Sequence, residues 1–244
     1  MIRNIYILLL LSTIGWGQVS LEIQNVSIDS TYGTLDIYMT NTAGCSYCTD
    51  ATYPDEGGCI LYGSVNNNSV LDATWEFSTD IDQTTCEAWD AATEVGTNGA
   101  YFDGLVGGFQ FQLFGATIDG ASGGSAEDNG FIINAQAATY NAETDTQLPN
   151  ILAFSLTGAT ISPGEGVLLS VSFSDFEGES ICFGEDTGSA GGTAISDGNG
   201  GYIAADWGDC YICESGFVDC AGECDGTAEN DCAGVCGGST TQEV

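Results

Sequence analysis

The sequence predicts an all-β protein: a two-sheet β-sandwich with a cysteine-rich insertion and a disulfide-rich C-terminal tail. Three observations predict this class. Apolar and polar residues alternate with a period of two in many short segments, glycine-rich turns separate these segments, and no long segment has helical periodicity. Short antiparallel strands of this kind pack as two facing sheets.

The stretch 106–124 is predicted to hold the central strand of the sandwich. In an extended chain Phe109, Phe111 and Leu113 point to one face, and Gln110 and Gln112 point to the other. Two glycines precede this pattern and a cluster of Gly and Asp follows it. We therefore expect the rest of the chain to fold around this strand.

The other predicted strands lie on both sides of it. Residues 19–28 and 35–39 form a predicted hairpin around a turn at 30–33. Later segments alternate in the same way, and the clearest of them places Leu168 with serines on the face opposite Val167 and Leu169. These later predicted strands are 131–136, 152–156, 167–173, 181–183 and 202–204.

Residues 43–98 differ in residue pattern from the predicted strands on either side and are predicted to be an insertion into the sandwich. This segment contains four cysteines, which we expect to form two disulfides: Cys45, Cys48, Cys59 and Cys86. A strand within 70–78 and a short helix within 84–92 are its predicted elements.

The first 17 residues are predicted to be a secretory signal. Arg3 supplies the positive charge, 5–11 the apolar region and 15–17 the small residues of a cleavage site. The apolar run is short for a membrane span, and an uncleaved anchor is the alternative. The predicted domains are therefore the signal at 1–17, the sandwich at 18–212 and the tail at 213–244, in an extracellular or cell-surface protein.

Arg3 is the only basic residue, there is no His, and the formal net charge is −34. This composition excludes nucleic acid and anionic membrane surfaces as partners, because phosphate contacts require Lys or Arg. Divalent cations, calcium above all, are predicted partners because calcium prefers hard oxygen ligands. Adaptation of solubility to salty water is the alternative explanation of the charge.

Eleven cysteines in an exported chain predict disulfides, and their odd number leaves one thiol without a partner in this chain. Position alone suggests that Cys182 pairs with Cys210. The cysteines predicted to be bonded are Cys45, Cys48, Cys59, Cys86, Cys182, Cys210, Cys220, Cys224, Cys232 and Cys236.

The tail repeats an eight-residue unit, DCAGECDG at 219–226 and DCAGVCGG at 231–238. Such a unit has almost no apolar side chain to bury, so disulfides must hold its structure. A four-cysteine zinc site is the alternative, but export, the spacing and the missing His favour disulfides.

Four segments together resemble the cohesin-like domains: 33–39, 106–113, 151–156 and 164–173, with GGFQFQL and GEGVLLSVSF the most specific. The resemblance spans about 19–210 and implies a nine-stranded jelly-roll sandwich related to carbohydrate-binding modules. Cohesins bind dockerin modules through one sheet face, which the insertion here could cover. The tail resembles DCAGVCGG-type repeats of large secreted proteins of marine bacteria.

The residues needed for most catalysis are missing. Without His or a mature Lys, Ser–His, Cys–His and lysine nucleophiles are excluded. A carboxylate pair for glycoside hydrolysis remains, but 35 acidic residues make any such pair unspecific. The chain is therefore predicted not to be an enzyme.

Two oxygen-rich segments are candidate calcium sites, one at Asp80 and Asp82 and the other at Asp197 and Asn199. Neither completes an EF-hand loop, and an ordinary Asx turn is the alternative at each.

Aromatic residues are candidate platforms for glycan stacking. Trp207, in a polar setting, and Trp89 are the predicted ligand-binding residues, whereas Trp75, two residues before Phe77, is predicted to be core. The predicted function is a non-catalytic binding or adhesion module that recognises a glycan or an extracellular protein. The alternatives are a glycan-binding module or fragment of a carbohydrate-active enzyme, and a structural surface-layer component.

Overall fold

A computed structural model confirms the all-β, sandwich-like fold with its disulfides. It describes residues 18–29, 32–65, 71–90, 92–93, 95–141, 146–176, 180–188, 192–213, 219–220 and 226–238, without the side chains of 136–149. The predicted signal at 1–17 lies outside these residues. Within them, no helix has the length and apolar character needed to cross a bilayer.

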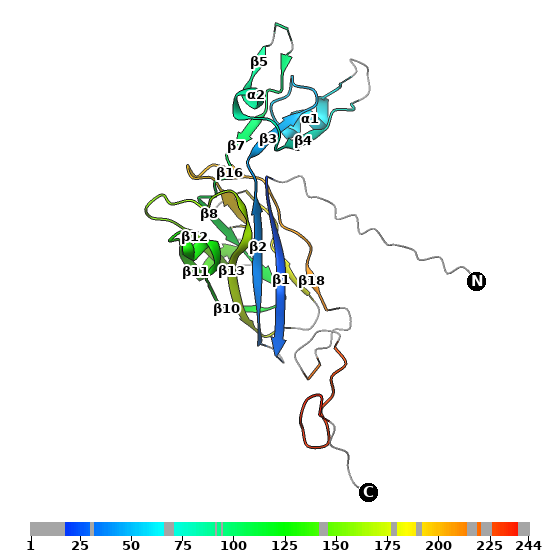
Figure 1. Ribbon diagram of the computed structural model, residues 1–244, viewed down its shortest axis with the longest axis vertical. Helices are drawn as coiled ribbons and strands as arrows, with labels where there is room; N and C mark the ends of the chain where they lie inside the picture. Colours follow the sequence, from blue (N-terminus) through cyan, green and yellow to red (C-terminus); the bar gives the residue numbers. More distant parts are fainter. Residues whose placement is uncertain are drawn as a thin grey trace, which may run out of the picture.

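The first sheet has five strands. Their order is β10 (Thr117–Ser122), β13 (Gly164–Ser174), β2 (Tyr32–Asn41), β1 (Val19–Asp29) and β17 (Ala205–Asp206). All neighbours are antiparallel except β1 and β17. The predicted hairpin is confirmed as β1 and β2, which are two long neighbouring strands of this sheet (Figure 1).

The second sheet also has five strands. Their order is β11 (Ile132–Asn141), β12 (Thr146–Phe154), β8 (Gly108–Phe111), β15 (Ala194–Ser196) and β16 (Tyr202–Ile203). β8 lies in the middle, which confirms the predicted central strand.

The stretch 106–124 is nevertheless not one strand. After β8 the chain enters β9 (Leu113–Phe114), which joins a small third sheet with β14 (Ser180–Phe183) and β18 (Tyr211–Ile212), and then β10 of the first sheet. A single segment thus contributes to three sheets.

The core fills the space between the two large sheets. Phe109 and Phe111 of β8 are 3% and 0% exposed, and they belong to one buried cluster with Ile37 and Phe173 of the first sheet. Burying a side chain of this size contributes about 1.5–3 kcal/mol, so this cluster is the main source of stability.

Register shifts change the alternation of several strands, and two of them lie in β1 and β13. Asn25 has φ 50°, and the β1–β2 register shifts between Gln24 and Ser27. In β13 the register shifts between Val167 and Leu169, so Leu168 and Leu169 are both buried. The predicted outward position of Leu168 is therefore wrong, because a bulge turns two successive side chains inward.

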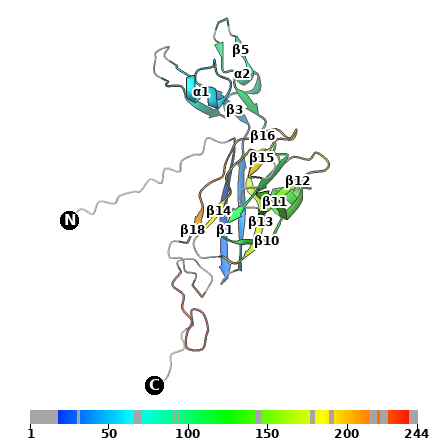
Figure 2. The ribbon, with the colours of Figure 1, turned by 180° about the vertical axis from the view of Figure 1, so that it is seen from behind.

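The insertion forms a separate small unit, here called the head (residues 44–102). Its central strand β3 (Gly44–Cys48) pairs with β4 (Trp75–Ser78) and β7 (Ala100–Phe102). The head lies at one end of the sandwich, beyond β16 (Figures 1 and 2). Its remaining elements are the helices α1 (Glu56–Tyr62) and α2 (Gln83–Glu87) and the strand pair β5 (Trp89–Asp90) and β6 (Val95–Gly96).

The two predicted disulfides of the head are confirmed. Cys48–Cys59 ties α1 to β3, and Cys45–Cys86 ties α2 to the same strand. The strand predicted within 70–78 is limited to 75–78, and the helix predicted within 84–92 ends at Glu87.

The remaining disulfides confirm part of the prediction. Cys182 pairs with Cys210 across a loop that stabilises the fold by about 3–4 kcal/mol on chain-entropy grounds, and Cys220 pairs with Cys236 in the tail. Cys232 is free and exposed, whereas Cys213 is bonded, so the prediction for these two is wrong. Cys224 lies outside the described residues.

Asn41 fastens the connection between head and sandwich. Its buried amide Nδ2 donates to the carbonyl oxygens of Gly104 at 2.6 Å and of Ser162 at 3.0 Å. Gln18 Nε2 adds a bond to Ser46 Oγ in the head at 2.8 Å. Both strands that enter and leave the head are therefore anchored.

Replacing Asn41 by Ala is expected to lower the free energy of unfolding by about 1–3 kcal/mol, because the buried carbonyl of Gly104 loses its donor and the part-buried bond to Ser162 is also lost. Chemical denaturation followed by near-ultraviolet circular dichroism measures the change. Asn230→Ala, at an exposed position of the tail, is the control. Equal stability of the two variants would contradict the role of Asn41.

Candidate functional site

A groove crosses the outer face of the second sheet. In the strand register, Phe154 of β12, Gly108 of β8, Ser196 of β15 and Tyr202 of β16 form one row. Phe154 is 36% exposed and Tyr202 is 52% exposed. Because Gly108 has no side chain, the surface is lower at this position than at the aromatic residues Phe154 and Tyr202, which form the two ends of the row.

The groove has a second row of residues beside the first. It encloses about 250 Å³, and its floor also includes Leu152, Gln110 and Ala194 from the same three strands. A Cβ on Gly108 would lie 3.2 Å from Ser196 Oγ, so a larger residue would fill the groove. Three strand spacings separate the two aromatic positions, which is about 14 Å.

Tyr202 is held in place from one side. Its hydroxyl donates to Asp186 Oδ2 at 3.2 Å, and Trp207 Nε1 donates to the same oxygen at 2.7 Å. Partial burial and the Asp186 carboxylate raise the pKa of Tyr202 to about 12. Tyr202 is therefore a neutral, oriented phenol at neutral pH.

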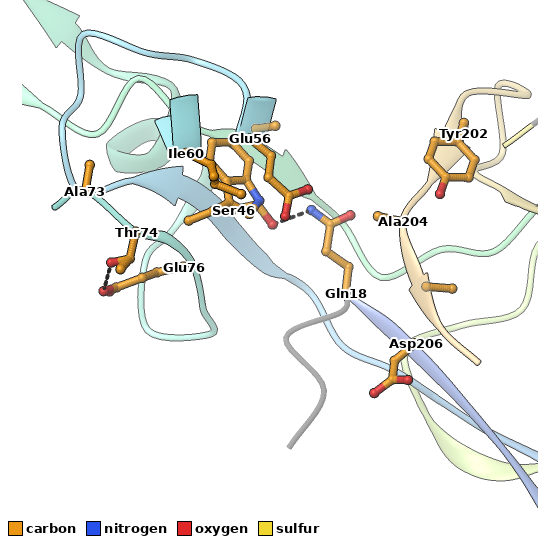
Figure 3. A pocket seen from close by; sticks show the side chains of 13 residues that line it. Gln18, Ser46, Glu56, Ile60, Ala73, Thr74, Glu76, Tyr202, Ala204 and Asp206 are labelled. Atoms are coloured by element: carbon orange, nitrogen blue, oxygen red, sulfur yellow. Dashed lines mark hydrogen bonds between the residues drawn. The ribbon is translucent and has the colours of Figure 1, made fainter. Parts of the chain in front are cut away.

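A second and larger cavity adjoins the groove. It has a volume of about 870 Å³ and lies between the head and the sandwich, and Tyr202 lines it as well as the groove. Figure 3 shows Glu56 and Ile60 of α1 on its head side, and Tyr202 and Asp206 on its sandwich side. The two cavities thus share one side chain.

The predicted ligand-binding residues do not line either cavity. Trp207 is half-buried against Phe111 and Phe183, with ring centroids 6.0 and 5.4 Å away, so the expected exposed ring is not found. Trp89 lies in β5 of the head. Trp75, predicted to be core, is half-buried and lines the larger cavity.

One sequence signal for the groove is present in the predicted strand at 152–156, whose alternation does not say which face is buried. Leu152, Phe154 and Leu156 form the larger apolar face of their segment, yet Ala153 and Ile151 are the buried ones, at 0% and 1%. A strand whose bulkier apolar face points to solvent is typical of a binding surface.

The predicted calcium ligands serve local roles. Asp82 caps α2 by accepting from Thr85 N at 2.8 Å, and this backbone hydrogen bond lowers its pKa. Asp197 Oδ1 accepts from the backbone N–H groups of Asn199 at 2.7 Å and Gly201 at 2.8 Å, which is an Asx turn. Asp80 follows β4 and donates its N–H to Ser78 Oγ.

No group of three or more acidic, Cys or His side chains converges on a metal position within the described residues. Calcium binding is not tested by this geometry and stays a prediction.

Comparison with known proteins gave no match: no family model, no curated protein and no solved structure is similar to this chain. The resemblance to cohesin-like domains therefore stays a prediction. The site is interpreted from its own chemistry.

Tyr202 should titrate near pH 12. Its folded pKa lies above its ordinary value of 10.0, so its contribution to stability is complete below pH 10 and is lost as the pH rises toward 12. The difference in phenolate absorbance between the native protein and Tyr202→Phe measures this titration. Asp186→Asn should move it to lower pH, though only in part because burial is the larger cause. A titration at the ordinary value would contradict this geometry.

Sodium chloride is expected to raise the midpoint of thermal unfolding, because the carboxylates have no Lys or His partner and salt screens their repulsion. Calcium chloride at the same ionic strength tests the predicted calcium sites. A further rise that Asp197→Asn removes and Asp128→Asn keeps would support them. A midpoint that does not respond to sodium chloride would contradict the electrostatic argument.

Proposed function

We propose that this protein is a secreted, non-catalytic glycan-binding module. One observation carries the proposal: the row from Phe154 over Gly108 and Ser196 to Tyr202 on the outer face of the second sheet. It is an open groove with aromatic ends on a rigid sheet.

The groove combines the two kinds of contact that sugars need. A pyranose ring has faces of C–H groups, which pack against aromatic rings, and hydroxyl groups, which require polar partners. Phe154 and Tyr202 supply the rings, while Gln110 and Ser196 supply an amide and a hydroxyl between them. Pockets with apolar walls and a few placed polar groups are typical of small-ligand sites.

The shape favours a glycan over a protein partner. A sheet face that binds a protein, as the cohesin resemblance implies, needs a broad surface of about 800 Å² on each side. Gly108 instead interrupts the apolar row and leaves a groove of about 250 Å³ between the two aromatic ends. A groove of this size suits a few units of a sugar chain better than the face of a protein.

Secretion and the lack of catalysis rest on composition. The disulfides of the head and sandwich require an oxidising compartment, which agrees with the predicted signal sequence. The absence of His and of any Lys removes the base that activates Ser or Cys nucleophiles and removes lysine nucleophiles.

Tyr202→Ala and Phe154→Ala are each expected to weaken glycan binding by roughly tenfold or more, because each removes an aromatic anchor from one end of the groove. A glycan array finds the ligand, and calorimetry on the best oligosaccharide measures the affinity.

The controls remove apolar side chains that are more exposed and lie outside both cavities. Tyr32→Ala, 65% exposed on β2, and Val95→Ala, 65% exposed on β6 of the head, should bind like the native protein. An array without hits, or binding that ignores both groove variants, would refute the proposal.

A further inference from the structure

The larger cavity is lined by acidic and aromatic side chains, and the elements that form it are held in place by several bonds. The Gln18–Ser46 bond and the Asn41 clasp hold the head against the sandwich. The Cys48–Cys59 disulfide holds α1 beside β3, and Cys48 pairs directly with Trp75 in the strand register. The walls of the cavity are thus restrained by a disulfide and by hydrogen bonds.

Three carboxylates line this cavity from different elements: Glu56 from α1, Glu76 from β4 and Asp206 from β17. No basic side chain occurs in the chain after Arg3, so no Lys, Arg or His side chain of the predicted mature chain neutralises them. Glu76 accepts from Thr74 Oγ1 at 2.9 Å and from the Tyr47 hydroxyl at 3.2 Å, which orients its oxygens.

Two aromatic rings line the same cavity. Trp75 comes from the head and Tyr202 from the sandwich. An organic cation within about 6 Å of such a ring gains a cation–π attraction, and Trp is the best partner for it. Aromatic rings and carboxylates in the same cavity therefore favour an organic cation as the ligand.

The spacing of the carboxylates favours this class over a metal ion. Calcium needs several oxygens that converge within about 2.3–2.6 Å of one point. In the part of the chain that the structure describes, no such group of acidic side chains occurs. Carboxylates spread around a cavity of about 870 Å³ instead suit an ammonium group on a larger molecule.

We propose that the cavity binds a protonated amino-sugar unit of the same glycan that lies in the groove, so that the protein selects cationic over neutral glycans. This inference rests on the proposed glycan-binding function. Tyr202 lines both spaces, so a chain leaving the groove past its ring enters the cavity with its next units. The ammonium group then meets Glu56, Glu76 and Asp206.

Two oligosaccharides of equal length and linkage test the proposal: a glucosamine hexamer and an N-acetylglucosamine hexamer. Calorimetry with the full mature chain is done at physiological salt and at a pH where the free amines are protonated. The glucosamine hexamer is expected to bind at least about tenfold more tightly. The triple variant Glu56→Gln, Glu76→Gln and Asp206→Asn should lose this preference.

A matched variant distinguishes the effect of the cavity carboxylates on binding from the effect of the net charge of the protein. Asp29→Asn, Asp128→Asn and Glu229→Gln together remove the same number of charges at exposed positions outside the cavity. This control should keep the preference for glucosamine. A control that loses it as fully as the cavity variant would overturn the proposal, because net charge alone would then explain it.

Two further outcomes distinguish this inference from the function on which it rests. Equal affinity for the two hexamers, with binding that still depends on Tyr202, would overturn the inference and leave the glycan-binding function standing. If Tyr202→Ala does not weaken binding of the glucosamine hexamer, the proposal that one glycan chain occupies both the groove and the cavity would be overturned.

Discussion

The register of β8 against its two neighbours is the constraint on which the rest of the structure depends. On the inner face it places Phe109 between Ala153 and Ile195, and on the outer face it places Gly108 between Phe154 and Ser196. A slip of one residue would exchange the two faces of the strand. The core and the groove are therefore two consequences of one pairing.

The missing basic residues impose a second constraint. Since no Lys or His is available, carboxylates find their partners among N–H and O–H donors. Asp55 and Asp82 cap the two short helices of the head, and Asp186 accepts from both Tyr202 and Trp207. The same lack of basic side chains leaves the carboxylates that line the cavity without an ionic partner among the side chains, and this is the basis of the proposed preference for a positively charged ligand.

The head shows how a small unit acquires fixed walls without a large core. Two disulfides attach its helices to β3, and the Asn41 amide attaches its base to the sandwich. Disulfides stabilise such units mainly by restricting the unfolded chain. This rigidity allows Trp75 and Glu56 to face Tyr202 and Asp206 across a defined space.

The sequence by itself determined the all-β class, the hairpin, the central strand, the presence of two disulfides in the head and the pairing of Cys182 with Cys210. These follow from local alternation, turn residues and cysteine content, which are properties of neighbouring residues. Only the tertiary structure decided which face of β12 is buried and that Leu168 turns inward at a bulge. It also decided that Cys232 is free. Trp75 and Tyr202 line one cavity only in the folded chain, where Trp207 packs on the core. Alternation gives two faces but does not say which one meets the opposite sheet, because that choice depends on the side chains that residues distant in sequence bring to the same place.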